Sequence, residues 1–366
     1  MRYLKISEQI NRIFNEWMEG EGRGFLYLPS LLYGIGVRLR FFLYRIGFFK
    51  TRKLACKVIS VGNITVGGSG KTPMAIYLAE RLRERGKKVV ILSRGYKGKI
   101  KDVGVVCNGE NILLDPEEAG DEPYLMAAKL KTVPVIVGRD RYRTGIYAVE
   151  RFKPDVILLD DGFQHIRFAR DIDIVLIDSR RGFGNGYLFP MGILREPLYG
   201  LKRASFFMIK GNELGIRNYE LQITNFKKQN KPFISFNYKP QAVINLVDGS
   251  KLSVDILKGK KVIALSGIAE PKSFSETLKE LGAIIIREII YPDHHFYTSD
   301  DLKRINVAME DAEFIVTTEK DGVKLKRLFP DRNIQGQAIK ETPIYTIAID
   351  INIKNTKDFN EILVNV

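Results

Sequence analysis

The stretch TVGGSGKT, residues 65–72, is the part of this sequence that says most about its fold. It follows the short β-branched run of residues 57–61 and opens a helical stretch, residues 72–85, with apolar residues on one face. A glycine-rich loop between a strand and a helix is the context that a phosphate-binding loop requires. Its glycines let backbone N–H groups converge on phosphate oxygens, and the helix N-terminus adds partial positive charge. We therefore expect this loop to hold the triphosphate of a nucleotide.

Two side chains of the loop have specific roles in phosphoryl chemistry. Lys71 is expected to reach the β- and γ-phosphates, and the Thr72 hydroxyl to ligate Mg²⁺. The loop departs from the general motif at its first position, where Thr65 stands in place of glycine. The alternative is a glycine turn that binds nothing. The predicted nucleotide-binding residues are Thr65, Val66, Gly67, Gly68, Ser69, Gly70, Lys71 and Thr72.

Apolar runs along the rest of the chain predict an α/β fold. They alternate with helical stretches such as residues 139–151, which indicates a mostly parallel sheet covered on both faces. Further strands are predicted at residues 89–92, 133–137, 156–159, 174–177, 206–209, 262–265, 284–290, 314–317 and 344–349. Residues 233–238 and 242–246 are predicted to be strands of a connector. The expected architecture is two α/β/α sandwich domains, the first with a P-loop NTPase-like parallel sheet, joined by a β-strand linker.

The predicted organisation has three segments, with the main boundary near Pro232. Residues 1–55 are an N-terminal helical segment, residues 56–232 the P-loop domain, and residues 233–366 the linker strands and second α/β domain. The net charge of +15, from 58 Lys and Arg against 43 Asp and Glu, favours an anionic partner. No zinc-finger or RNP-type signature accompanies the charge, so nucleic acid is not expected. The two cysteines form neither a disulfide framework nor a metal-ligand spacing.

Residues 25–49 are rich in Phe, Leu and Tyr and are interrupted by Arg38, Arg40 and Arg45. The longest uncharged run, residues 25–37, has 13 residues, whereas a spanning helix needs roughly 20. We interpret the segment as lying on an anionic membrane surface, with arginines at the headgroups. The alternative is a terminal helical hairpin packed on the core. A preceding apolar stripe at helical spacing consists of Ile6, Ile10, Ile13 and Trp17.

The run VILLDD, residues 156–161, is an apolar strand that ends in two carboxylates. This is typical of a Walker B element, in which a buried strand delivers an aspartate to Mg²⁺ beside the P-loop, so Asp160 and Asp161 are candidate ligands. A helix or turn cap is the alternative. Gln164 and His165 stand at the same strand end, although His165 is also compatible with an ordinary hydrogen-bonded loop histidine.

Further candidate residues lie in short polar motifs. In GDEP, residues 120–123, Asp121 is a good helix N-cap with Glu122 beside it, and capping alone would explain the motif. In YPDHHF, residues 291–296, His294 and His295 follow a predicted strand. The chain has only three histidines, and all of them lie in strand-end loops, which favours a proton-transfer function.

The LREP motif supplies a cation and a carboxylate after a glycine-rich stretch. Arg195 is suited to stabilising phosphoryl charge, and Glu196 to joining the Mg²⁺ shell. The run TTEKD, residues 317–321, is interpreted only as the N-terminus of a helix.

Over nearly its full length the sequence resembles the lipid A 4′-kinase (tetraacyldisaccharide 4′-kinase) family. The matching stretches are PSLLYG (29–34), SVGNITVGGSGKTP (60–73), SRGY (93–96), GDEP (120–123), DDGFQH (160–165), LREP (194–197), SGIAEP (266–271), PDHH (292–295) and TEKD (318–321). In this family the threonine at position 65 is the normal form of the loop.

The resemblance implies a membrane-associated P-loop kinase at the cytoplasmic face of the inner membrane, peripheral or monotopic. Such kinases transfer the γ-phosphate of ATP, with Mg²⁺, to the 4′-hydroxyl of an acylated glucosamine disaccharide 1-phosphate, giving lipid IVA. By motif, Asp121 would be the catalytic aspartate and His294 its histidine partner, with the adjacent His295 left as an alternative. Asp160, Asp161 and Glu196 would lie in the Mg²⁺ region, and Lys71 and Thr72 on the nucleotide.

Two other classes of function remain as alternatives. One is a membrane-associated P-loop NTPase that acts as a switch without a small-molecule acceptor, and the other is a soluble P-loop ligase or kinase. A guanine-reading NKxD motif would favour a GTPase, but TEKD shares only its Lys-Asp pair. An acid and a histidine together imply an acceptor to deprotonate, which favours the kinase.

Overall fold

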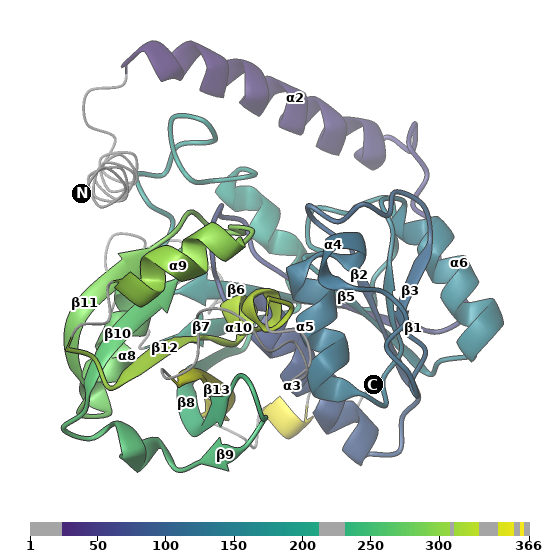
Figure 1. Ribbon diagram of the computed structural model, residues 1–366. Helices are drawn as coiled ribbons and strands as arrows, with labels where there is room; N and C mark the ends of the chain where they lie inside the picture. The colour runs from purple at the N-terminus through teal and green to yellow at the C-terminus, as the bar shows by residue number, and fades with distance from the viewer. Residues whose placement is uncertain (1–23, 212–230, 308–310, 329–342, 355–358, 362–366) are drawn as a thin grey trace.

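The computed structural model describes residues 24–211, 231–307, 311–328, 343–354 and 359–361. The predicted stripe of Ile6, Ile10, Ile13 and Trp17 lies outside these residues. Figure 1 shows two α/β halves side by side, with a long N-terminal helix lying across them.

The first half is a sheet whose central strand leads into the P-loop. β1 (Lys57–Gly62) pairs in parallel with β5 (Val156–Asp160) and β6 (Ile172–Asp178). Parallel strands β2 (Val89–Ser93), β4 (Val135–Val137) and β7 (Phe206–Lys210) extend it, and β3 (Gly104–Cys107) is an antiparallel edge strand. Side chains from alternate strand positions pack on α3 (Lys71–Glu84) and α5 (Asp121–Leu130) on one face, and on α6 (Arg141–Phe152) on the other. A short helix, α4 (Pro116–Ala119), precedes α5.

The second half repeats the same layering. Its parallel strands are β10 (Lys261–Ser266), β11 (Ile284–Ile290), β12 (Phe314–Thr318) and β13 (Ile344–Ile353). Val262 and Ala264 face α8 (Pro271–Glu280), whereas Ile263 and Leu265 face α9 (Ser299–Val307) and α10 (Glu319–Lys326). The α/β class, with a predominantly parallel P-loop-type sheet and helices on both faces, is confirmed.

One long strand makes the two halves a continuous sheet. β8 (Phe233–Asn245) pairs in parallel with β7 and antiparallel with β13, and the two-residue β9 (Lys251–Leu252) pairs with its end. The prediction of two separate connector strands was wrong, because a register irregularity opposite Ile349 accommodates Pro240 within one strand. The predicted segment boundaries stay a prediction, and β8 begins one residue after Pro232.

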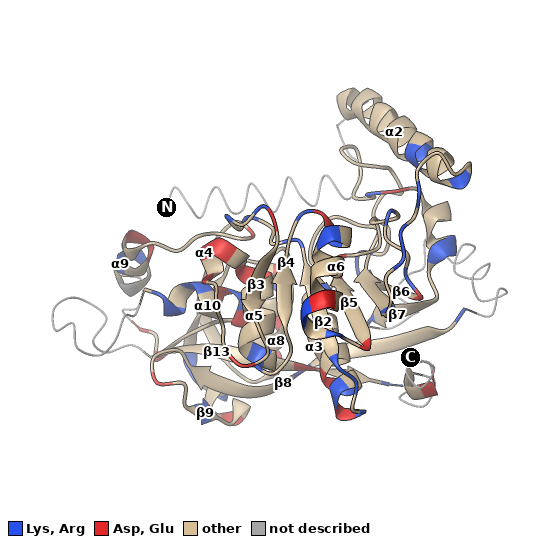
Figure 2. Ribbon diagram, turned by 90° about the vertical axis from the view of Figure 1, so that its right-hand side faces the viewer, with Lys and Arg blue, Asp and Glu red and all other residues tan. Residues whose placement is uncertain are grey.

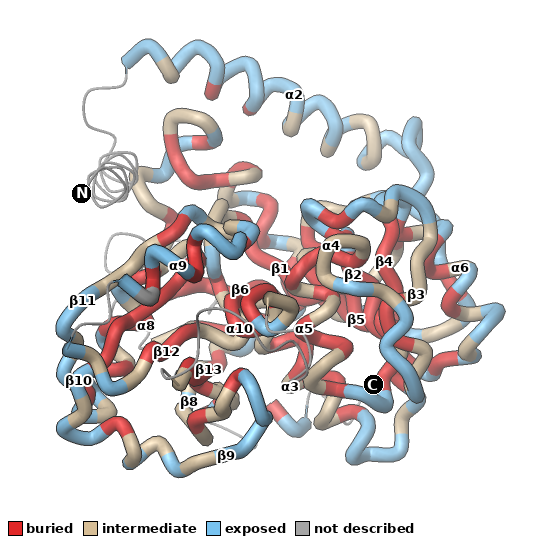
Figure 3. The backbone as a smooth tube through the Cα atoms, in the orientation of Figure 1, coloured by how far each residue is buried: buried red, intermediate tan, exposed pale blue. Residues whose placement is uncertain are grey.

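The N-terminal helix α2 (Tyr27–Arg45) follows a single 3-10 turn, η1 (Gly24–Leu26). Its buried residues are Ser30 and Gly34, and the hydroxyl of Ser30 donates to the carbonyl oxygen of Leu188 at 2.8 Å. Most of the helix surface is exposed (Figure 3). Residues 24–45 are long and apolar enough to cross a membrane by length and composition alone, and 11% of the most apolar window is buried.

Candidate active site

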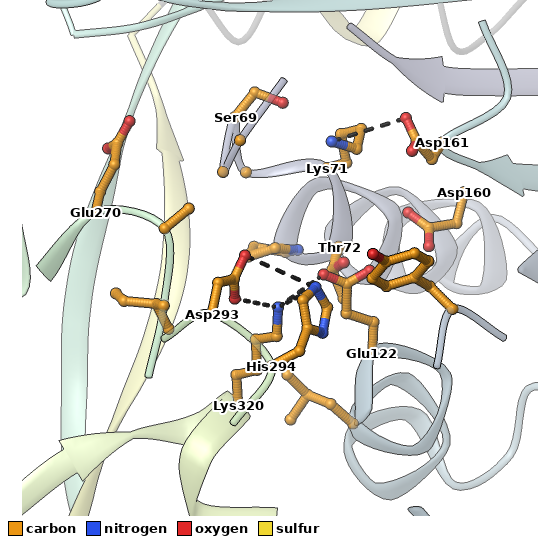
Figure 4. Close-up of a pocket in the computed structure, with 18 of the residues that line it drawn as sticks. Ser69, Lys71, Thr72, Glu122, Asp160, Asp161, Glu270, Asp293, His294 and Lys320 are labelled. Atoms are coloured by element: carbon orange, nitrogen blue, oxygen red, sulfur yellow. Dashed lines mark hydrogen bonds and ion pairs between the residues drawn. The ribbon is translucent and has the colours of Figure 1, made fainter. Parts of the chain in front are cut away.

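A cavity of about 840 Å³ opens where the carboxyl ends of the strands of both halves face each other. The first half contributes the P-loop and the residues that follow β2 and β5, and the second half those that follow β10, β11 and β12. Ligands of α/β proteins bind at this edge of a parallel sheet. In Figure 4 Lys71, Thr72 and Asp161 lie on one side of the cavity, with His294 and Lys320 facing them.

The P-loop has the backbone that phosphate binding requires. Gly70 is the N-cap of α3 with φ of 83°, and a Cβ there would lie 2.1 Å from the hydroxyl oxygen of Tyr238, so only glycine fits. Within the described residues the buried hydroxyl of Ser69 has no hydrogen-bond partner. Val66 to Thr72 line the cavity. Thr65 does not, because it forms a bridge to Leu194 at the base of the loop.

Asp160 ends β5 with one carboxylate oxygen unpartnered. Its Oδ2 accepts a hydrogen bond from the Ser93 hydroxyl at 3.0 Å, while its buried Oδ1 has no partner among the described residues. Burial, Glu122 and Asp161 raise the pKa of Asp160 to about 7. A divalent cation would relieve this unfavourable negative charge, and Thr72 lies on the same side of the cavity (Figure 4). The residues present therefore fit Mg²⁺.

Asp161, by contrast, is already surrounded by positive charge. Nη1 of Arg195 lies 3.0 and 2.9 Å from its two carboxylate oxygens, and Nζ of Lys71 lies 3.7 Å from Oδ1. Burial opposes ionisation, but Lys71 and Arg195 outweigh it and hold the pKa of Asp161 well below its ordinary value. Three predicted site residues thus form one charged group at the P-loop.

Glu196 lies away from this group. Its side chain is buried, does not line the cavity, and accepts from Nη2 of Arg203 at 2.8 and 3.0 Å. Both carboxylate oxygens of Glu196 are therefore bound by Arg203. This geometry does not support the prediction that Glu196 is an Mg²⁺ ligand. Burial raises the pKa of Glu196.

Gln164 and His165 line the cavity near the Walker B strand. The amide of Gln164 donates to the carbonyl oxygen of Asn63 at 2.7 Å, which ties this loop to the end of β1. Burial and the guanidinium of Arg141 lower the pKa of His165 to about 4, so its imidazole is neutral near pH 7.

Asp121 and His294 meet across the two halves. The N-cap of α5 is Gly120, with φ of 91°, and Asp121 is the first helical residue, so the predicted cap was wrong. Its carboxylate faces Nδ1 of His294, at 2.9 and 3.0 Å from the two oxygens. Burial opposes ionisation of Asp121, but the hydrogen bond from His294 and the ammonium groups of Lys320 and Lys324 outweigh it and lower its pKa to about 2.

His295 points elsewhere. Its Nε2 lies 3.0 Å from Oδ2 of Asp301, and its ring stacks on Tyr291 with centroids 4.3 Å apart. It does not line the cavity. Of the two adjacent histidines, the one that faces Asp121 is His294.

One residue that sequence reasoning set aside lies in the middle of the site. Nζ of Lys320 lies 3.0 Å from Oε1 of Glu122, 3.1 Å from Oδ1 of Asp293 and 3.3 Å from Nε2 of His294 (Figure 4). The interpretation of its motif as a helix N-terminus was correct, since Thr318 caps α10. The signal that could have marked it was the position of the motif at the end of a predicted strand, which was given no functional weight.

The chain is similar to kinases along almost all of its length. A family model described as LpxK, tetraacyldisaccharide-1-P 4′-kinase, matches residues 23–366. The tetraacyldisaccharide 4′-kinase of Desulfatibacillum aliphaticivorans is 40% identical over 92% of this chain and 91% of its own, and that of Syntrophus aciditrophicus is 41% identical over 91% and 90%.

The fold agrees with a solved structure of the same family. A crystal structure of LpxK from Aquifex aeolicus in complex with ATP superposes with a TM-score of 0.73 at 34% identity, covering 94% of this chain and 98% of that one. These relationships and the P-loop cavity agree on an ATP-dependent kinase of the lipid A precursor pathway. The chain belongs to the tetraacyldisaccharide-1-phosphate 4′-kinase family.

Proposed function

We propose that this kinase transfers the γ-phosphate of ATP to the 4′-hydroxyl of a tetraacylated glucosamine disaccharide 1-phosphate, giving lipid IVA, with Asp121 accepting the hydroxyl proton. The observation that carries the proposal is His294, which lines the cavity opposite Lys71 and whose Nδ1 lies 2.9 Å from the carboxylate of the buried Asp121. A switch NTPase needs no such acceptor side.

The transfer is a single displacement. The 4′-oxygen forms a bond to the γ-phosphorus, while the bond from that phosphorus to the β–γ bridging oxygen breaks and ADP leaves with its electron pair. The hydroxyl proton passes to a carboxylate oxygen of Asp121. In a loose transition state the hydroxyl becomes acidic late, so a carboxylate of low pKa is a sufficient acceptor. Nδ1–H of His294 keeps that carboxylate oriented throughout.

The P-loop side stabilises the charge that is transferred. Lys71 and Arg195 both lie on Asp161, and we expect both cations to exchange this contact for phosphate oxygens when ATP binds. Asp160 and Thr72 would hold Mg²⁺, which neutralises phosphate charge when it is bound. Asp161 would lie beside them at the P-loop, in the predicted Mg²⁺ region.

We further propose that α2 lies on the cytoplasmic face of the inner membrane as a peripheral or monotopic anchor. Six apolar residues at helical spacing form an exposed stripe along it: Leu28, Leu32, Ile35, Leu39, Phe42 and Ile46. The opposite side packs on the protein through Ser30 and Gly34. Basic residues gather toward the end of the helix (Figure 2), where they would meet anionic headgroups. A helix with one exposed apolar stripe suits an interfacial position.

The helix also connects that surface to the cavity. The hydroxyl of Tyr33 donates to the carbonyl oxygen of Arg195 at 2.7 Å, and Arg40 bonds to the carbonyl oxygen of Gln164. Both helix residues line the cavity. A disaccharide whose acyl chains remain in the bilayer would reach the P-loop along this side.

The direct test is a radiolabel transfer assay. The purified protein is incubated with γ-³²P-ATP and a tetraacylated disaccharide 1-phosphate in detergent micelles, with and without Mg²⁺. We expect label in the lipid fraction only with Mg²⁺, and product analysis that places the phosphate on the 4′ position. Release of label solely as inorganic phosphate would favour the switch NTPase.

A further inference from the structure

The start of α10 contacts the catalytic helix α5 at two points. Glu319 binds Lys129 near the end of α5, with 2.9 Å between nitrogen and oxygen, while Lys320 binds Glu122 at its beginning, at 3.0 Å. α10 belongs to the second half of the molecule and α5 to the first. Two adjacent residues therefore tie the second half to α5, Lys320 beside Asp121 and Glu319 near the other end of the helix.

The ammonium of Lys320 sits among acceptors. Besides Glu122 it contacts Asp293 and Nε2 of His294, and it lies 3.8 Å from Oδ2 of Asp121. Burial alone would lower the pKa of Lys320, but Glu122, Asp121 and Asp293 outweigh it and raise that pKa above the ordinary value. The group is therefore an ammonium, which donates hydrogen bonds and cannot accept them.

This contact determines which ring nitrogen of His294 carries the proton. Because the ammonium only donates, a hydrogen bond at this contact requires Nε2 of His294 to accept, which leaves Nδ1 as the ring nitrogen that carries a proton. Nδ1–H then donates to Asp121, whose carboxylate only accepts. A second proton on Nε2 would have to displace Lys320.

We infer that Lys320 is a positioning residue of the phosphoryl transfer: by binding Glu122, Asp293 and Nε2 of His294 at once, it keeps Nδ1–H of the imidazole directed at Asp121. The predicted fall in kcat rests on the proposed role of Asp121 as proton acceptor. The contact between Lys320 and His294 does not depend on that role.

The other groups around His294 do not replace this contact. Oδ2 of Asp293 lies 3.7 Å from Nε2, and without Lys320 it would draw a proton onto that nitrogen. Lys324 lies 3.8 Å from Asp121 but is paired with Asp321 at 2.9 Å. The ring of Tyr96 packs edge-on against the imidazole, with centroids 5.1 Å apart, and supplies no charge there.

The kinetic test uses Lys320→Met, Lys320→Arg and, as a matched control, Lys326→Met at an exposed position of the same helix. We expect Lys320→Met to lower kcat by about 10- to 100-fold with the KM for ATP within about twofold, because the acceptor side alone is disturbed. Lys320→Arg keeps the charge and should recover at least part of the loss, and the control should match the parent. A kcat for Lys320→Met within about twofold of the parent would overturn the inference.

A spectroscopic readout separates positioning from simple stability. The chain has three histidines, so ¹⁵N-imidazole labelling gives three ring spectra, and His294→Gln identifies the relevant one. At about pH 8, where a free imidazole is neutral, we expect a proton on Nδ1 and none on Nε2 in the parent. In Lys320→Met we expect the Nε2 signal to move toward its protonated position. A proton on Nε2 in the parent, or identical His294 spectra in both proteins, would contradict the inference.

If Lys320→Met does not fold, as judged by circular dichroism, Lys320→Gln is measured against the same limits, because its amide can still donate to Glu122. If Asp121→Asn retains normal turnover, the proposed proton acceptor fails, yet the His294 spectra still show whether Lys320 sets the protonation of the ring. The failure of one proposal is thereby distinguished from the failure of the other.

Discussion

Nδ1 of His294 lies 2.9 Å from Oδ2 of Asp121, although the two residues are 173 positions apart in the chain. Asp121 begins α5 in the first half of the molecule, and His294 follows β11 in the second. The pair therefore exists only while the two halves are held together at this point. Any change that separates them removes the orientation of the proton acceptor without touching the P-loop.

The two adjacent histidines should respond very differently to substitution. His294→Gln removes the hydrogen bond from Nδ1 to the Asp121 carboxylate, and we expect a loss of phosphoryl transfer of about 100-fold with ATP affinity largely kept. His295→Gln, the matched control, alters a contact with Asp301 outside the cavity and should keep kcat within a few-fold of the parent. Steady-state kinetics of both variants, with thermal unfolding as a folding check, measure this. Equal losses in the two would refute the assignment.

The pH dependence of the transfer should show no acidic limb from Asp121. Its ionised form is the active one, and a pKa of about 2, below the ordinary 3.8, means that this form persists to lower pH than in a free carboxyl group. In His294→Gln the hydrogen bond is lost while the burial remains, so the pKa rises and activity is lost at a higher pH than in the parent. Profiles of log kcat over the pH range in which the protein stays folded test this. Because Asp160 has a pKa of about 7, the profiles are recorded at saturating Mg²⁺, and a parent profile that still falls near pH 6 would assign the base to another group.

The Mg²⁺ requirement should distinguish Asp160 from Glu196. Asp160→Asn removes the charge of a buried oxygen that has no partner in the described part of the chain, and we expect the half-saturating Mg²⁺ concentration to rise about tenfold or more. Glu196→Gln loses a bond to Arg203 instead, so the Mg²⁺ dependence should stay that of the parent. Transfer rates measured across a Mg²⁺ titration decide it. A shift caused by Glu196→Gln alone would restore the sequence-based prediction.

The exposed stripe of α2 should carry the membrane affinity. Replacing Leu32 and Leu39 by Asp places two charges in the apolar stripe, so binding to vesicles that contain anionic phospholipid should fall strongly. The matched control replaces the exposed Ile112 and Leu113, which lie outside this helix, by Asp. Co-sedimentation with vesicles gives the bound fraction. Equal binding of both double variants would rule out this stripe as the anchor.

Local sequence patterns predicted the elements around the P-loop well. β1, the loop and α3 lie where the glycines and the apolar spacing placed them, and β5 delivers Asp160 beside them. The continuous sheet could not be predicted in the same way, because the local sequence around Pro240 indicates the end of a strand. The pairing of β8 with β13 over most of its length overrides that local signal.

The sequence predicted most of the motifs that form the site, but it did not predict which side chains contact one another there. The strand-end position of His294 marked it for function, but nothing local distinguished it from His295. Glu196 read as a metal ligand because its partner, Arg203, lies seven positions further on in a separate short helix, η2 (Leu198–Arg203). Lys320 gave no signal alone, since its role depends on carboxylates from both halves of the molecule.

The role of Asp121 is tested most sharply by Asp121→Asn, a substitution that keeps the size of the side chain and removes its ability to accept the hydroxyl proton. Single-turnover transfer from radiolabelled ATP to the acylated disaccharide 1-phosphate is compared with nucleotide affinity measured by calorimetry. We predict a fall in the transfer rate of about 100-fold or more with the Kd for ATP within a few-fold of the parent. A transfer rate close to that of the parent would show that Asp121 does not prepare the acceptor hydroxyl.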